Sequence, residues 1–143
     1  MIEVRQQGVI EAPVKTVWNL LADPNRHSEW WPSVIETDCE EIGVGCRYRA
    51  VTKGPLGRAE EHEIVIESLD DCREVSIYCE EVGVRNRFVL TEARGATFVD
   101  ADFSIDPRTL GDRVFANTVG RRFLRRWLAD SIDSLRRAAH GPR

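Results

Sequence analysis

The chain has 143 residues, a formal net charge of −4 and a sequence isoelectric point near 5.4. This length predicts one domain over residues 1–143, able to bury roughly two thirds of its unfolded surface. The negative balance argues against a nucleic-acid-binding surface spread over the domain. No apolar run approaches the roughly 20 residues of a membrane span, and no signal-peptide pattern is found. We therefore expect a cytoplasmic protein that neither crosses a membrane nor binds nucleic acid.

The first predicted elements are a strand and two short helices. Apolar and polar residues alternate from Ile2 to Ile10, as in a half-buried strand. A short helix after Pro13 stops at Asp23-Pro24, and a second short helix ends in the pair Trp30-Trp31. Because these two tryptophans are adjacent, we expect their rings to point in different directions, with one ring at the edge of a cavity.

Six further strands follow at hairpin spacing, separated by turns that contain Gly or Asp. They are predicted over residues 34–41, 46–53, 58–69, 73–81, 84–92 and 96–106. Apolar and charged side chains alternate along them. This pattern predicts an antiparallel sheet with one covered face and one solvated face.

The C-terminal segment is predicted to cover the sheet. From Leu124 to Ala139 the apolar residues share one arc of a helix, and arginines and aspartates occupy the other arc. A helix that begins near Arg108 has about 30 residues and is roughly 45 Å long. Toward its start the covering face turns small or polar, at Gly120, Asn117 and Arg113. Either Gly120 kinks the helix, or this polar stretch overlooks a cavity.

Four cysteines form two C-x6-C pairs: Cys39 with Cys46, and Cys72 with Cys79. This spacing, without C-x2-C or nearby histidines, does not indicate zinc. We expect no metal and no cofactor, and all four cysteines as buried free thiols.

Several short motifs carry a resemblance to a known family: Ala12-Pro13, Val17-Trp18, Leu21, Asp23-Pro24, the segment 30–34 and Gly43-Val44-Gly45. With the order of elements, they resemble the START-like (helix-grip, SRPBCC) superfamily, most closely its bacterial polyketide cyclase/dehydratase branch. The resemblance implies an α+β fold, in which a curved seven-stranded antiparallel sheet wraps around a long C-terminal helix over a deep cavity. It does not indicate which ligand is bound, because members bind lipids, sterols, quinones, polyketides and plant hormones.

Polar residues on the covered face are the candidate anchors for a ligand. His62 is either a general base or a histidine hydrogen-bonded at the sheet rim. Asn86 needs a hydrogen-bond partner on its apolar face, and the Tyr48 hydroxyl either meets a ligand or reaches water. The predicted ligand-binding residues are Trp30, Trp31, Tyr48, His62, Ile64, Asn86, Phe88, Phe103, Arg113, Asn117 and Gly120. His62 and Tyr48 are also the catalytic candidates.

These patterns predict a protein that binds a hydrophobic or aromatic small molecule, lipid- or polyketide-like, beneath the C-terminal helix. One alternative is a polyketide cyclase/dehydratase-type enzyme, a lyase or isomerase, acting in that cavity. A second alternative is a protein-interaction module that uses the basic helix face. The oligomeric state stays open between monomer and homodimer.

Overall fold

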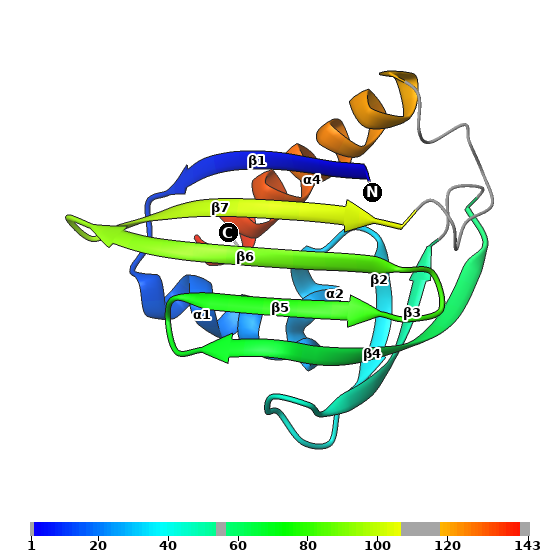
Figure 1. Cartoon of the computed structure of the whole chain (residues 1–143). Coiled ribbons are helices and arrows are strands. Elements are labelled where there is room, and N and C mark those ends of the chain that lie inside the picture. Colours follow the sequence, from blue (N-terminus) through cyan, green and yellow to red (C-terminus); the bar gives the residue numbers. More distant parts are fainter. Residues whose placement is uncertain (1, 54–56, 107–117, 141–143) are drawn as a thin grey trace.

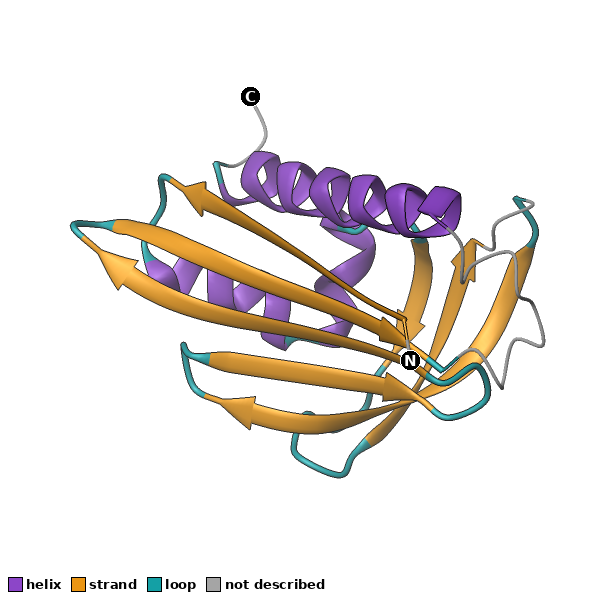
Figure 2. Ribbon diagram, turned by 45° about the horizontal axis from the view of Figure 1, so that its top comes forward, coloured by secondary structure: helices purple, strands orange, loops and turns teal. Residues whose placement is uncertain are grey.

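The computed structural model describes residues 2–53, 57–106 and 118–140, and in it a curved antiparallel sheet encloses the helices (Figure 1, Figure 2). The elements are β1 (Ile2–Ile10), α1 (Val14–Ala22), the 3-10 helix η1 (Pro24–Arg26), α2 (His27–Trp30), β2 (Val34–Asp38), β3 (Arg47–Lys53), β4 (Ala59–Asp70), β5 (Glu74–Cys79), β6 (Val84–Ala93), β7 (Ala96–Ile105) and α4 (Thr118–Ala139). The seven strands are ordered β1-β7-β6-β5-β4-β3-β2, so the first and last strands in sequence are neighbours. The predicted α+β helix-grip fold is confirmed.

The strand boundaries agree with the predicted ones to within three residues, and the largest difference is at β2. This strand ends at Asp38 and not at residue 41. The Cys39 backbone N–H donates to Asn25 Oδ1 at 2.9 Å, and Asn25 Nδ2 donates back to the Cys39 carbonyl at 2.9 Å. The side chain of Asn25, a residue of η1, therefore pairs with the Cys39 backbone groups that a longer strand would have used for its own hydrogen bonds.

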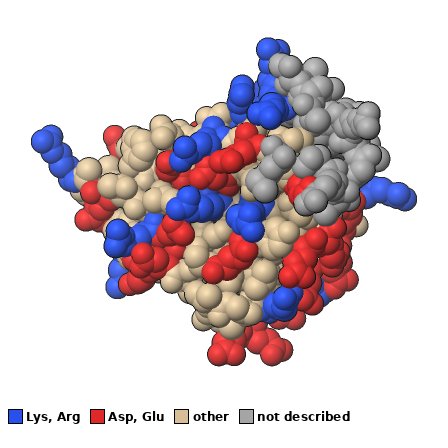
Figure 3. Space-filling model, in the orientation of Figure 1, with Lys and Arg blue, Asp and Glu red and all other residues tan. Residues whose placement is uncertain are grey.

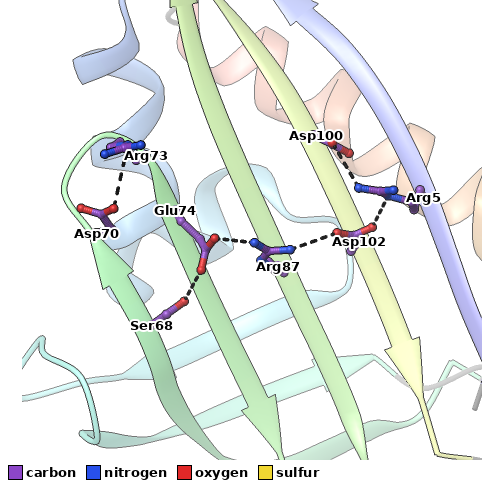
Figure 4. A network of polar contacts seen from close by, with 8 residues as sticks. All are labelled: Arg5, Ser68, Asp70, Arg73, Glu74, Arg87, Asp100 and Asp102. Atoms are coloured by element: carbon purple, nitrogen blue, oxygen red, sulfur yellow. Dashed lines mark hydrogen bonds and ion pairs between the residues drawn. The ribbon is translucent and has the colours of Figure 1, made fainter.

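The outer face of the sheet is solvated, as predicted, and carries cross-strand ion pairs (Figure 3). In Figure 4, Arg87 lies between Glu74, at 2.6 Å, and Asp102, at 3.8 Å. Arg5 contacts the same Asp102 at 2.7 Å and Asp100 at 3.4 Å. Exposed pairs of this kind each contribute little to stability. Their charged side chains do identify this face of the sheet as the solvated one, so the apolar face lies on the other side.

Helix α4 covers the inner face beside β1 (Figure 2). Its buried side chains are those of the predicted stripe: Leu124, Leu128, Ser131, Ile132 and Leu135. Its 22 residues give a length of about 33 Å. The predicted start near Arg108 lies outside the described residues.

The close contact between α4 and β1 occurs at Gly8. A Cβ atom at this position would lie 2.8 Å from Ile132 Cγ2 and 3.2 Å from Arg136 Nη2. Arg136 also donates to the Val9 carbonyl at 3.1 Å. The absence of a side chain at Gly8 therefore sets how near the helix lies to the strand.

The end of α1 is capped by side chains from α2. The last carbonyl groups of a helix have no partner within it. The indole Nε1 of Trp30 donates to the Leu20 carbonyl at 2.9 Å, and His27 Nε2 lies 2.8 Å from the Leu21 carbonyl. A carbonyl only accepts, so Nε2 of His27 carries the proton. These two bonds fix the angle between the short helices.

Trp30 and Trp31 do not point in different directions, and that expectation is wrong. Their rings stack, with centroids 4.9 Å apart and planes 8° apart, and both side chains are buried. Both rings also meet Phe88 edge-on, at 6.0 and 5.7 Å. Trp31 has extended backbone angles after the last residue of α2, and this break in the helix lets adjacent side chains share one side.

We expect Gly8→Ala to destabilise the protein by about 1–3 kcal/mol, because the new methyl group overlaps Ile132 in a packed interface. Urea unfolding measures the change. Gly43→Ala is the matched control, since its Cβ would lie 3.5 Å from Cys46 Sγ, an ordinary contact. In the Ile132→Ala background Gly8→Ala should cost clearly less. An equal cost in both backgrounds would show that the contact is not the cause.

Burial lowers the pKa of the His27 imidazole from 6.5 to about 4. The unfolded chain takes up this proton at higher pH than the folded one, so the free energy of unfolding falls as pH drops from 6.5 toward 4. We expect a loss of about 2 kcal/mol between roughly pH 7 and pH 5. In His27→Gln this part of the pH dependence should disappear, whereas His140→Gln should retain it. Urea titrations at both pH values test this; identical pH profiles for wild type and His27→Gln would contradict it.

Candidate functional site

A cavity of about 450 Å³ lies between the sheet, α2 and α4. Its volume is within the range of small-molecule sites, about 300–1,000 Å³. Most of its lining is apolar. The described residues that line it are His27, Trp31, Pro32, Ser33, Val34, Thr37, Tyr48, Ala50, Thr52, Lys53, Glu60, His62, Ile64, Ile77, Tyr78, Cys79, Val82, Val84, Asn86, Phe103, Ile105, Phe123, Leu124 and Trp127.

The strand register shows where the cavity ends. Two neighbouring cross-strand rows contribute to its wall: Cys79–Val84–Ile105 and Ile77–Asn86–Phe103. No member of the next row, Val75–Phe88–Ala101, is among the lining residues. The stacked tryptophans lie against Phe88 in that row. The cavity therefore stops where the tryptophan pair begins to fill the core.

Six of the predicted ligand-binding residues line this cavity: Trp31, Tyr48, His62, Ile64, Asn86 and Phe103. Trp30 and Phe88 do not line it; they are buried behind its end. Phe88 is on the predicted face but one row too far along its strand. Arg113 and Asn117 lie outside the described residues. Gly120 belongs to the first turn of α4, where side-chain surroundings are not described, so the kink and the polar stretch both stay predictions.

Aromatic rings form one side of the cavity. The Trp127 ring centroid lies 6.1 Å from that of Trp31 and 5.2 Å from that of Phe103. Trp127 is half-buried: it packs against the core and also lines the cavity. Aromatic faces of this kind stack on flat apolar ligands.

Three buried polar atoms of the lining have no hydrogen-bond partner among the described residues: Trp31 Nε1, Tyr48 Oη and Asn86 Oδ1. The three side chains are 4%, 3% and 8% exposed. Burial raises the pKa of the Tyr48 hydroxyl, so it stays a neutral phenol. The indole N–H and the phenol O–H can donate hydrogen bonds, while the unpaired amide oxygen accepts.

His62 lies at the edge of the cavity between two carboxylates. Its Nε2 is 3.3 Å from Glu60 Oε2, and its Nδ1 is 3.4 Å from Glu81 Oε2. Glu60 also lines the cavity, whereas Asn86 is not among the partners of His62. The contacts are those of a rim histidine, yet the ring remains beside the cavity.

Among the lining residues that sequence reasoning did not select, His27 and Phe123 matter most for the argument below. His27 was not selected, although it precedes Trp31 by four positions and so shares its side of a helical turn. Phe123 lines the cavity and is 53% exposed, which places it at the opening. In the sequence it lies beside the apolar stripe, on a side of the helix that a kink at Gly120 would turn inward. Together with the exposed Lys53 and Glu60, Phe123 marks what we call the cavity mouth.

Within the described ranges, no group of His, Cys, Asp or Glu side chains is arranged to hold a metal ion. Across the same residues, no helix has the length and hydropathy needed to cross a membrane. All four cysteines are free thiols. Cys39 and Cys79 are buried as predicted, but Cys46 and Cys72 are only half-buried.

The structure is similar to solved structures of low sequence identity. A protein from Arthrobacter aurescens superposes with a TM-score of 0.75 at 14% identity, covering 98% of this chain and 87% of that one. An AHSA1-like protein from Aeromonas hydrophila gives 0.70 at 14% identity, with 95% and 90% covered. DynU16, described as a putative protein in the dynemicin biosynthetic locus, gives 0.70 at 19% identity, with 97% of this chain but 47% of that chain covered. These likenesses show the fold alone.

Sequence comparison identifies the family. No curated protein matches the chain. The family model described as "Polyketide cyclase / dehydrase and lipid transport" matches residues 1–140. Since this match spans nearly the whole sequence and the fold agrees with it, the chain belongs to that family, within the START-like superfamily.

Proposed function

We propose that this protein binds an uncharged, polyketide-like aromatic molecule in the cavity between the sheet and α4. The observation that carries the proposal is the set of three unpaired polar atoms on Trp31, Tyr48 and Asn86, all in the cavity lining. Leaving a buried polar group without a partner costs about 1–3 kcal/mol. A ligand that pairs with these atoms recovers that cost in the bound state, so their arrangement favours particular ligands.

The charges of the described lining favour a neutral ligand. On β3 and β4 the ionisable lining residues are Lys53, Glu60, His62 and the neutral phenol Tyr48, and Lys53 and Glu60 are exposed at the mouth. His27 lies deeper and stays neutral at physiological pH, because burial lowers its pKa to about 4. A ligand carboxylate deep in the cavity would be desolvated without a cationic partner among these residues.

The polar atoms are also spread over different walls. Tyr48 is on β3 and Asn86 on β6, three strand intervals away in the sheet order. At about 4.8 Å per interval, their backbones are roughly 14 Å apart along the curved sheet. This separation favours a ligand that carries polar groups at separate positions on a flat skeleton. A lipid with a single head group satisfies only one of the two walls.

Tyr48→Phe and Asn86→Leu test this proposal with 1,8-dihydroxyanthraquinone as the probe and calorimetry as the measurement. We expect each variant to weaken binding about tenfold, since each removes one hydrogen bond to the ligand. The two effects should add in the double variant, because the residues contact different groups. Anthracene, which has no polar substituent, is the control ligand and should bind all variants alike.

Two outcomes would contradict the proposal in different ways. If neither the two aromatic probes nor 1-hexadecanol bind, the cavity is not a ligand site. If 1-hexadecanol binds tightly and the dihydroxyanthraquinone affinity is unchanged in Tyr48→Phe, the ligand is a single-headed lipid.

A second candidate function is cyclisation or dehydration of such a molecule in the same cavity. The specific observation is His62, which borders the cavity while both ring nitrogens approach carboxylates. A carboxylate beside one ring nitrogen orients the imidazole, as a histidine general base requires. Tyr48, with its neutral phenol, can donate to a substrate carbonyl.

For this second function we expect His62→Gln to reduce turnover of a linear poly-β-ketone at least a hundredfold while ligand affinity and stability change little. Product formation followed by mass spectrometry is the measurement. Glu61→Gln is the matched control, because Glu61 is the neighbouring residue on the outer face, where it pairs with Arg49. Equal losses of stability, affinity and turnover in His62→Gln would instead give His62 a structural role.

A further inference from the structure

The first turns of α4 carry an exposed patch of one aromatic and several basic side chains beside the cavity mouth. We call Arg122, Phe123, Arg125 and Arg126 the α4 patch; all four are exposed. We propose that this patch docks the protein on an anionic lipid surface, with Phe123 in the interfacial layer and the cavity mouth next to the lipid. The proposal concerns where the ligand is exchanged and does not depend on which ligand is bound.

The arginines of the patch differ from those of the sheet. On the outer face Arg5 and Arg87 each meet a carboxylate on a neighbouring strand, and Arg85 reaches Glu67 two strands away. By contrast, no side-chain partner for Arg122, Arg125 or Arg126 is found within the described ranges, and residues 121–126 include no acidic residue. The patch is therefore locally cationic although the whole chain has a net charge of −4.

Phe123 joins this basic patch to the cavity. It is 53% exposed, yet it also lines the cavity together with Trp127, which follows it by one helical turn. Arg122 precedes Phe123 by one residue and Arg126 follows it by three, so the two exposed arginines flank the ring on successive turns of the helix. An aromatic ring flanked by arginines at the edge of an apolar surface is typical of segments that lie in a membrane interface.

The chemistry favours a lipid surface over a protein partner. A stable protein interface needs roughly 800 Å² per partner and a largely apolar centre, whereas this patch offers a single aromatic ring. An anionic bilayer needs no matching shape, and each basic residue near it strengthens binding about fivefold. On the β4 side of the mouth, Glu60 and Glu81 both approach His62, so that side is acidic and we expect α4, and not β4, to contact the lipid.

Vesicle co-sedimentation tests the proposal with the full chain. The probes are phosphatidylcholine vesicles with and without about one third phosphatidylglycerol. We expect at least tenfold stronger binding to the anionic vesicles, weakening as salt rises. Arg122→Glu/Arg126→Glu should abolish this preference, and Phe123→Ser should weaken binding severalfold at any salt concentration.

Arg73→Glu/Arg94→Glu is the matched control, because it changes the net charge equally at exposed turns on the opposite end of the sheet (Figure 1). It should retain binding to the anionic vesicles. An equal loss in this control, or no preference of the wild type for anionic vesicles, would overturn the proposal. Thermal unfolding of each variant shows whether its fold is intact. If a charge-reversed variant is unstable, vesicle binding of Phe123→Ser, a substitution at an exposed position, still tests the proposal. Ligand affinity should be unchanged in the arginine variants, so a failure here is distinct from a failure of the cavity to bind.

Discussion

The contact of α4 with β1 at Gly8 determines how the inner face of the sheet is used. Because Gly8 has no side chain, Ile132 and the helix around it lie close to the edge strand. One helix of about 33 Å, seated at that edge, cannot also fill the space in front of β3 and β4. Tight packing on one side thus leaves a cavity of about 450 Å³ on the other. The cavity is a consequence of where the helix is placed.

The two short helices close the end of this space. Side chains of His27 and Trp30 take the unpaired carbonyls at the end of α1, and this places Trp31 against the cavity. The tryptophan pair therefore has two roles within one stack of rings. Trp30 caps a helix and fills the core, while Trp31 directs an unpaired indole N–H into the lining. Neutral His27 supports both rings edge-on, which links the integrity of the cavity to pH.

Helix α4 combines three environments along one element. Leu128 and Leu135 are fully buried against the sheet, Trp127 borders the cavity, and Arg126 is in solvent. Phe123 lies where the last two environments meet. This arrangement places the proposed docking patch and the proposed ligand site on one rigid helix, so a ligand that leaves the mouth would pass next to the surface to which the patch binds.

The sequence by itself determined the fold, the faces of the strands and the stripe of the covering helix. Alternation with a period of two assigns Tyr48, Asn86 and Phe88 to the inner face, because each strand residue must point to one side or the other. Periodicity does not tell how far along a strand the cavity extends. The sequence therefore placed Phe88 in the cavity lining, whereas in the structure the tryptophan pair covers the cross-strand row that contains Phe88. Nor could it show that adjacent tryptophans stack, since this depends on the backbone break after α2. Only the tertiary structure decided which polar atoms stay unpaired and that Phe123 borders both the cavity and solvent. These properties depend on contacts between elements far apart in the chain.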